Sequence, residues 1–374
     1  MRYKLPELCN IQYGYAFDSK KFTEDDTYPP LIRIRDVKRG YSETFYAGDY
    51  PQEYIVHAGD LLIGMDGEFN IARWNSRDAL LNQRVCKITA KEGINEEYIR
   101  FALSKGLKII ENKTSFVTVK HLSAKELNKI ELSIPVGLEQ NKIACILKNI
   151  ENIINIRQRQ LEKLSEIVRA RFVEMFGDPI SNPYRYDKVP LSELADIKIG
   201  PFGSLLHKED YIEGGHPLLN PSHIADGKIL SDDKLTISDE KYEELSAYQL
   251  KTGDVVMGRR GEMGRCAVVP RDGFLCGTGS ILIRTKGEIT ADYIQKIISF
   301  PSFKKSIEDM AVGQTMPNLN VPIVSRFQII KPPLEVQDRY YKFVAQVDKS
   351  KDSVQKALDE AQLLFDSLMQ QYFG

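Results

Sequence analysis

The sequence has few cysteines and no long apolar run. No two cysteines form a CxxC pair, and their odd number leaves at least one thiol outside any intrachain disulfide. No stretch of eighteen or more apolar residues is present, and residues 1–10 lack the apolar core of a signal peptide. We therefore expect a cytoplasmic protein whose thiols are reduced and mostly packed. The cysteines are Cys9, Cys86, Cys145, Cys266 and Cys276.

The motifs of common catalytic sites are also missing. No GxxxxGK[ST] loop is present to hold a triphosphate, and no HExxH pair is present to hold zinc. The "NPY" at residues 182–184 lacks the second proline of the adenine methyltransferase loop, so we interpret it as a linker turn. The histidines have no metal-ligand spacing; they are His57, His121, His207, His216 and His223. The sequence thus predicts a chain without catalytic residues, bound metal or bound cofactor.

A strong positive charge is absent as well. The net charge is −1, and neither half of the chain, divided at Tyr186, is a basic polyelectrolyte. If the protein binds nucleic acid, its basic residues must gather on one face, or a partner must add phosphate contacts.

The most informative feature that is present is an internal repeat. "LPELCNIQYGYAF" (5–17) corresponds to "LSELADIKIGPFG" (191–203), and "YIVHAGDLLIGMDGEFNIARW" (54–74) corresponds to "YQLKTGDVVMGRRGEMGRCAV" (248–268). "INEEYIRFALS" and "ELSIPVGLEQ" have counterparts in "ITADYIQKIIS" and "QIIKPPLEVQ", in the same order. Each copy ends on Phe-Gly, at 176–177 and 373–374. Two copies of one architecture predict two related surfaces in a pseudo-two-fold arrangement.

Each copy combines a globule with a long helix. Short apolar runs between glycine-rich turns predict strands, and residues 95–113 predict a helix capped by Asn95, so we expect a mixed α/β (α+β) globule. Prolines precede and glycines follow a long helical pattern in both copies. The predicted segments are a first globule at 1–137, a central helix at 138–178, a second globule at 179–333 and a C-terminal helix at 334–374.

Apolar residues in the two helical segments follow the alternating three- and four-residue spacing of a coiled coil. The matching register favours an antiparallel pair, and the alternative is two independent amphipathic helices that each lie on their own globule. The predicted seam residues are Leu147, Ile150, Ile154, Leu161, Leu164, Val168, Val347, Val354, Leu358, Ala361, Phe365 and Leu368.

Polar and basic turns occupy equivalent places in the two globules but differ in sequence, as "MDGEFNIAR" and "RRGEMGR" do. Such side chains on short rigid segments can read base edges and phosphates of DNA. Solvated surface is the alternative for any single residue. The candidate DNA-binding residues are Arg33, Arg35, Lys38, Asn70, Arg73, Asn82, Gln83, Arg84, Lys120, Asn220, Ser222, His223, Arg259, Arg260, Arg265, Thr278, Ser280, Gln314, Asn318 and Asn320.

Together these segments resemble a known family. "SELADIKIGPFGSLLHKEDY", "YQLKTGDVVMGRRGEMGRCAVV", "CGTGSILIR" and "NLNVPIVSRFQIIKPPLEVQ" resemble a target-recognition domain of type I restriction–modification specificity subunits. The first copy, with "GYAFDSKKF" and "LLNQRV", is similar to another such domain, and the resemblance covers essentially the whole chain. "IPVGLEQ" departs from the family pattern because a second proline is common there.

The resemblance implies a non-catalytic subunit that binds a bipartite double-stranded DNA sequence and holds two methyltransferase subunits. S-adenosylmethionine would bind to those partners, which flip adenines, and ATP and Mg²⁺ would serve a motor-nuclease subunit where one joins. The alternatives are a recognition subunit of a type IIB-like or modification-only system, a non-DNA coiled-coil scaffold, and a stand-alone enzyme. The last is weakened by the missing motifs.

Overall fold

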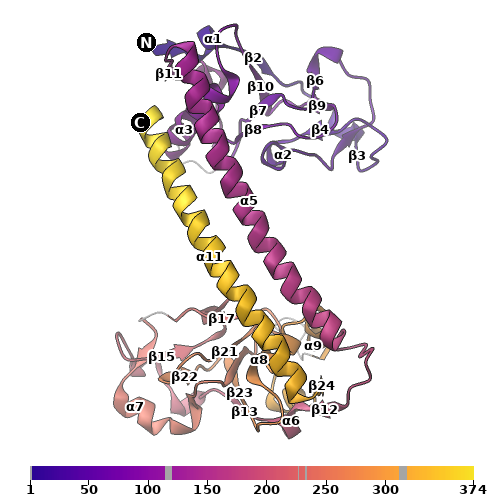
Figure 1. Cartoon of the computed structure of the whole chain (residues 1–374), viewed down its shortest axis with the longest axis vertical. Helices are drawn as coiled ribbons and strands as arrows, with labels where there is room; N and C mark the ends of the chain where they lie inside the picture. Colours follow the sequence, from indigo (N-terminus) through magenta and orange to yellow (C-terminus); the bar gives the residue numbers. More distant parts are fainter. Residues whose placement is uncertain (1, 114–119, 226, 232–233, 311–317) are drawn as a thin grey trace. The chain divides into compact units, whose positions relative to one another are not determined.

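The chain folds into two units, each of which combines one predicted globule with one half of each long helix. The computed structural model describes residues 2–113, 120–225, 227–231, 234–310 and 318–374. Unit 1 comprises Met1–Gln160 and Ser353–Gly374, and unit 2 comprises Leu161–Asp352. Both units are mixed α/β structures (Figure 1), which confirms the predicted fold class.

Unit 1 is built on an antiparallel sheet. Its strand order is β2 (Cys9–Tyr13), β10 (Val85–Ala90), β7 (Leu61–Gly64) and β8 (Ile71–Arg73). Helix α3 (Glu96–Lys113) packs on this sheet, with short helices α1 (Leu5–Leu8) and α4 (Ala124–Leu127) beside it. Strand β1 (Arg2–Lys4) pairs with β11 (Glu131–Ser133).

A smaller layer completes the first globule. It contains the sheet β4 (Leu31–Ile32), β9 (Ala79–Leu81) and β6 (Ile55–Val56), and the pair β3 (Phe22–Thr23) and β5 (Phe45–Tyr46). Helix α2 (Ile34–Arg39) and the 3₁₀ turns η1 (Ser19–Lys21) and η2 (Gln52–Tyr54) connect these strands. Its core includes the fully buried Trp74.

Unit 2 repeats this topology. Its sheet has the order β13 (Ala195–Ile199), β23 (Ser280–Thr285), β20 (Val255–Gly258) and β21 (Cys266–Val268), which matches β2, β10, β7 and β8 one for one. Strand β12 (Lys188–Pro190) pairs with β24 (Gln328–Ile330), as β1 does with β11. Helix α6 (Leu191–Leu194) takes the place of α1, and α8 (Ala291–Ile298) takes the place of α3. The internal repeat of the sequence is thus a repeat of structure.

The second layer of unit 2 is larger than its counterpart. Its sheet has the order β14 (Tyr211–Ile212), β18 (Thr236–Ile237), β15 (His216–Leu219), β22 (Phe274–Cys276) and β19 (Gln249–Leu250). The hairpin β16 (Ile224–Ala225) and β17 (Lys228–Ile229) lies against β21. The remaining elements are α7 (Asp239–Glu244), α9 (Pro301–Met310), α10 (Val321–Ser325) and the 3₁₀ turns η3 (Gly203–Leu205), η4 (Lys208–Asp210), η5 (Pro221–His223) and η6 (Ser246–Tyr248).

One glycine in each unit allows two chain segments to cross. A Cβ atom on Gly14 would lie 2.0 Å from the carbonyl oxygen of Asn82, and a Cβ on Gly200 would lie 2.0 Å from that of Gly277. No other residue fits at such a distance. These glycines therefore fix the turns at 82–84 and 277–280 beside the first strand of each sheet.

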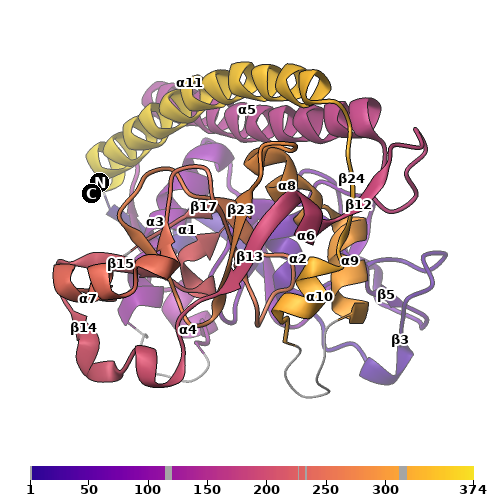
Figure 2. The same cartoon turned by 90° about the horizontal axis from the view of Figure 1, so that it is seen from below.

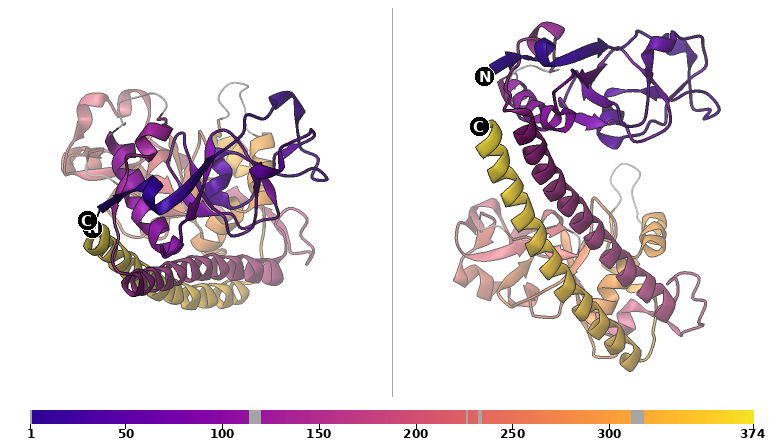
Figure 3. Two further views of the ribbon diagram at one scale, coloured as in Figure 1. Left: turned by 90° about the horizontal axis from the view of Figure 1, so that it is seen from above. Right: turned by 45° about the horizontal axis from the view of Figure 1, so that its top comes forward.

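The two long helices are unbroken (Figure 3). They are α5 (Gly137–Phe176) and α11 (Leu334–Phe373), as predicted. In unit 1 the beginning of α5 packs with the end of α11, where Leu147 shares a core with Phe365 and Leu368. In unit 2 the end of α5 packs with the beginning of α11, where Val168 shares a core with Val347. The two helices are therefore antiparallel, and none of the predicted seam residues is exposed.

A buried glutamine joins each long helix to its globule. The side-chain oxygen of Gln140 accepts a hydrogen bond from Asn95 N (2.9 Å), and its amide nitrogen donates to Pro135 O (3.0 Å). Gln337 makes the same pair of bonds, with Thr290 N (3.0 Å) and Pro332 O (2.9 Å).

Helix α8 in unit 2 lies between its sheet and α11 (Figure 2).

Candidate nucleic-acid interface

Three polar turns converge in unit 1, and we call them turn cluster 1: residues 65–70, 82–84 and 120–122. Backbone hydrogen bonds hold them together, from Met65 N to Arg84 O (2.9 Å), from Leu122 N to Met65 O (2.7 Å) and from Gly67 N to Lys120 O (2.9 Å). Segments that are separate in the sequence are thereby placed on one rigid frame, as a base-reading surface requires.

Unit 2 carries the equivalent turn cluster 2: residues 259–265, 277–280 and 318–320. Arg259 N donates to Gly279 O (3.0 Å), and Leu319 N donates to Arg259 O (2.9 Å). The bridge between Arg260 and Asn318 corresponds to the bridge between Asp66 and His121 in unit 1. The two units therefore present different side chains on the same frame.

Five of the predicted DNA-binding residues line one cavity of ≈ 490 Å³ in unit 1. They are Arg33, Arg35, Asn82, Gln83 and Arg84. The exposed Arg33 guanidinium has no hydrogen bond or ion pair within the described residues, and Arg35 Nε lies 3.7 Å from an oxygen of Asp36. This face offers three guanidinium groups and two amides to a ligand.

The Arg84 guanidinium already has an interaction partner inside the protein. Its Nε lies 3.4 Å from an oxygen of Asp66, and the His121 ring hydrogen-bonds the other oxygen of the same carboxylate. Sequence reasoning missed Asp66 and His121 because only the paired turns bring them together. Their position in two polar turns was the available signal.

The other predicted residues of unit 1 have internal partners. Lys38 Nζ lies 3.8 Å from Glu68, Asn70 also contacts Glu68, and Lys120 Nζ lies 3.3 Å from Glu111. Arg73 lies on β8 outside turn cluster 1. Its guanidinium is only 28% exposed and pairs with Glu96 at 2.8 Å and with Glu97.

In unit 2, Arg260 and Thr278 are exposed, and neither side chain has a hydrogen bond or ion pair within the described residues. Arg259 Nε donates to Asn318 Oδ1 (3.1 Å), and burial together with the charge of Arg260 lowers the pKa of Arg259. Arg265 is held at the turn by Glu262 (2.8 Å) and Pro221 O (3.2 Å). Arg260 and Thr278 of turn cluster 2 therefore present side-chain donors that have no internal partner among the described residues.

Several predicted residues of unit 2 support the backbone. The buried His223 hydrogen-bonds Leu218 O (2.8 Å), and the fully buried Ser280 hydroxyl donates to Leu219 O (2.7 Å). Asn220 Oδ1 accepts from Gly279 N (3.4 Å), and Asn320 caps α10 by accepting from Ile323 N (3.0 Å). Ser222 is exposed beside them, and Gln314 lies outside the described residues.

The described residues contain no group of three or more His, Cys, Asp or Glu side chains that could hold a metal ion. Four of the thiols are buried, and burial raises their pKa to about 12, so they are poor nucleophiles. No helix within the described ranges is long and apolar enough to span a bilayer. The turn clusters are suited to recognition through charge and hydrogen bonds.

The chain is similar to known proteins over most of its length. A family model described as "Type I restriction modification DNA specificity domain" matches twice, at residues 1–166 and 183–362. The type I restriction enzyme EcoBI specificity subunit of Escherichia coli is 27% identical over 397 residues, which cover 99% of this chain and 84% of that protein. The MjaVIII specificity subunit of Methanocaldococcus jannaschii is 21% identical over 361 residues, which cover 89% of this chain and 84% of that protein.

Solved structures share the fold. The S subunit of a type I restriction-modification system from M. genitalium has a TM-score of 0.56 at 15% identity, covering 100% of this chain and 96% of that one. A chain from a study of complex assembly and conformational transition of the type I R-M system has a TM-score of 0.59 at 17% identity, covering 100% and 97%.

Proposed function

The chain belongs to the family of type I restriction modification DNA specificity domains, and we propose that each unit reads one half of a bipartite DNA target. The observation that carries this proposal is the pair of turn clusters. One frame is built twice, with Arg33, Asn82 and Arg84 in unit 1 and with Arg260 and Thr278 in unit 2. Two different readers on one scaffold suit two different half-site sequences.

The proposal includes a division of labour. The chain supplies specificity without catalysis, in a bacterial or archaeal cytoplasm, and methyltransferase subunits supply S-adenosylmethionine and the adenine-flipping step. ATP and Mg²⁺ belong to a motor-nuclease partner where one joins.

The long helices are the proposed docking surface for the methyltransferase subunits. In unit 1, Leu138 of α5 is 85% exposed, and Ile153 and Ile156 are exposed on nearly the same side of that helix. On α11, Leu363 is 73% exposed and Leu364 is exposed beside it. Apolar residues at helical spacing fit a partner helix, and family membership favours the methyltransferase subunit as that partner.

Genome-wide mapping of N6-methyladenine tests the function. Cells with this gene and its methyltransferase partner should methylate one bipartite motif, which disappears when this gene alone is deleted. The rigorously purified chain should transfer no methyl group on its own. Methyl transfer by the isolated chain, or an unchanged methylome after deletion, would contradict the proposal.

A further inference from the structure

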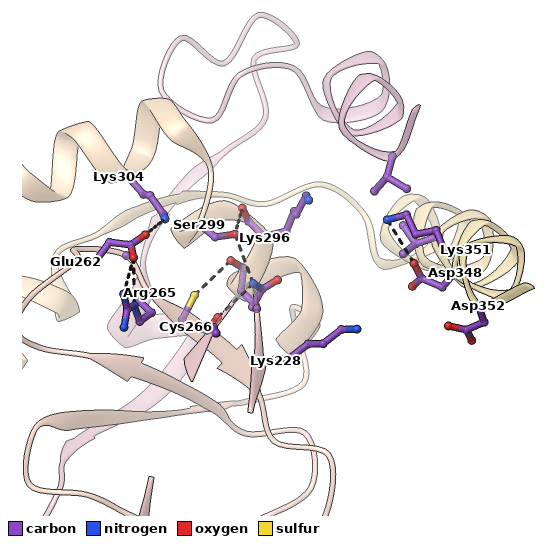
Figure 4. Close-up of a pocket in the computed structure, with 16 residues that line it drawn as sticks. Lys228, Glu262, Arg265, Cys266, Lys296, Ser299, Lys304, Asp348, Lys351 and Asp352 are labelled. Atoms are coloured by element: carbon purple, nitrogen blue, oxygen red, sulfur yellow. Dashed lines mark hydrogen bonds and ion pairs between the residues drawn. The ribbon is translucent and has the colours of Figure 1, made fainter. Parts of the chain in front are cut away.

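Unit 2 contains a second polar cavity, of ≈ 770 Å³, that the reading of bases does not use. It lies between the globule and α11, beside turn cluster 2 (Figure 4). Its basic wall residues come from five elements or turns: Lys228 of β17, Arg265 of the β20–β21 turn, Lys296 of α8, Lys304 of α9 and Lys351 of α11.

The internal repeat shows which side chains fill the equivalent place in unit 1. Asn95 and Thr290 cap α3 and α8 at the same position, so Arg100 corresponds to Gln295 and Phe101 to Lys296. In unit 1 Phe101 packs against Phe365 of α11, with ring centroids 6.0 Å apart.

Unit 2 has smaller or differently charged residues at these positions. Gln140 of α5 and Gln337 of α11 make equivalent bonds and so occupy equivalent positions in the two copies. By the same alignment, Val168 of α5 is equivalent to Phe365 of α11, and Asp348 of α11 is equivalent to Glu151 of α5. The aromatic contact is thus replaced by Lys296 and Val168, which both line the cavity.

An ion pair is missing from unit 2 in the same way. In unit 1 Arg100, only 14% exposed, reaches Glu151 of α5 at 2.6 Å. Gln295 stands in its place in unit 2 and instead donates to Cys266 O (3.4 Å), so within the described residues Asp348 of α11 makes no ion pair with a side chain of α8. The cavity therefore results from specific substitutions between the two copies.

Among the described residues that line the cavity, positive charge exceeds negative charge. Lys228 and Lys296 make no hydrogen bond or ion pair through their ammonium groups within the described ranges, and Lys351 lies on the facing helix (Figure 4), 3.8 Å from Asp348. Burial, followed by the charges of Lys351 and Arg169, lowers the pKa of Lys296, against an opposing effect of Asp348. An anion placed among these ammonium groups would relieve their repulsion.

One wall of the cavity already binds an oxyanion of the protein itself. The Glu262 carboxylate accepts from Lys304 Nζ (2.8 Å) and from Arg265 Nη2 (2.8 Å), and these partners hold its pKa at about 2. Among the described residues, the remaining acidic side chains of the lining are Asp348 and Asp352, so its described basic residues outnumber the acidic ones. Because Glu262 already neutralises Lys304 and Arg265, the described ammonium groups left for an incoming phosphate oxygen are those of Lys228 and Lys296.

We propose that this cavity binds a phosphate group of the DNA backbone next to the half-site that unit 2 reads. The inference rests on the proposed function. DNA is favoured over other anions because the β20–β21 turn carries both Arg260, a candidate reader, and Arg265, a wall residue. Backbone contacts beside the bases fix the register of a reader on the duplex.

The test uses Lys228→Met and Lys296→Met in the full chain. Fluorescence anisotropy measures affinity over a salt series for a duplex with the recognised sequence, known from methylation mapping, and for a scrambled duplex. Both substitutions should weaken both duplexes by the same factor and reduce the slope of log K against log salt by about 0.9 each. Lys296→Arg should keep the wild-type slope.

Lys251→Met is the matched control, because the exposed Lys251 lies near the opposite end of β20 from the reading turn. It should leave the slope unchanged. Thermal unfolding checks the fold, and Lys228→Met should melt like the wild type because Lys228 is exposed. If the wild-type chain bound DNA but both lysine variants kept its slope and affinity, the inference would be overturned.

Further outcomes separate this inference from the proposed function. Wild-type protein that binds no duplex at low salt would overturn both. Inorganic phosphate binding that Lys296→Met abolishes, with unchanged DNA affinity, would overturn the assignment to DNA. Impaired assembly with methyltransferase subunits at an unchanged salt slope would likewise overturn it, in favour of an acidic segment of the partner.

Discussion

At the scale of single residues, each of the two buried glutamines satisfies two backbone groups. Gln337 is fully buried; its side chain accepts a hydrogen bond from Thr290 N and donates one to Pro332 O. Gln337→Ala leaves both backbone groups unpaired, which should lower the free energy of unfolding by about 1–3 kcal/mol per unsatisfied group. Urea denaturation measures this loss. Gln355→Ala, on the exposed surface of α11, should change stability little; equal effects at both sites would show that the bonds of Gln337 contribute nothing.

A second residue-scale prediction concerns turn cluster 2. Arg260 is exposed and its side chain has no partner within the described part of the chain, whereas Arg265 is held by Glu262. Arg260→Ala should cost about 1–3 kcal/mol of DNA affinity and relax one base position if it reads a base, or weaken all sequences equally if it binds phosphate. Binding assays on single-base variants of the target distinguish these results. Arg271, exposed and stacked on Phe274, is a control outside the turn clusters. Affinity unchanged by Arg260→Ala would place the reader elsewhere.

Individual site residues could be predicted only in part. The sequence places Arg33, Asn82 and Arg84 in polar turns, and the structure brings them to one cavity. Ser280 and Asn320 looked equivalent in the sequence, yet they bond the backbone. The same hydroxyl and amide groups that read bases also satisfy turns and helix caps. Only the fold shows which of these groups already have a partner inside the protein. The side chains therefore remain predicted DNA contacts, and they differ in how free they are to bind DNA.

At the scale of elements, the spacing of apolar residues predicted the long helices better than residue type predicted the individual site residues. Coiled-coil spacing predicted both long helices to within about two residues at each end, because a seam sustained over many turns leaves little freedom of assignment. Short strands such as β4 and β16 were not predicted one by one, since two residues carry no period. The hairpin β16–β17 of unit 2 likewise has no counterpart in unit 1 that the repeat could reveal, because helix α2 follows β4 there.

The docking face of α5 can be tested with a native probe. Cys145 is exposed on α5, near the side that carries Leu138 and Ile156, whereas the other thiols are buried. Because burial raises the pKa of those four thiols to about 12, iodoacetamide at pH 8 should alkylate Cys145 first. Methyltransferase subunits should protect Cys145, as mass spectrometry of the assembled complex would show. Full alkylation within a stable complex would place the partner on another face.

At the scale of the whole molecule, duplication predicts modular specificity. Each four-stranded sheet and its turn cluster lie within one unit, and every backbone hydrogen bond that holds a turn cluster together is internal to that unit. Replacing residues 1–138 with the corresponding domain of a relative should therefore change one half-site and leave the other intact. Methylation mapping of the chimaera gives the answer directly. A chimaera that altered both half-sites would mean that the units read DNA jointly.

The last prediction concerns the spacing between the half-sites, which we expect the length of helix α5 to set. Its 40 residues, at about 1.5 Å each, make it about 60 Å long, and it contributes to both units. Four residues inserted near Gln158 add about 6 Å and slightly more than one helical turn, a stutter that a coiled coil absorbs by local unwinding.

Because the rise of DNA is about 3.4 Å per base pair, the recognised gap should lengthen by one or two base pairs with both half-sites unchanged. Methylation mapping of the insertion variant measures the gap. A two-residue insertion is the control, since it rotates the seam by more than half a turn and should abolish methylation. An active four-residue variant with the original gap would show that the helix does not set the spacing.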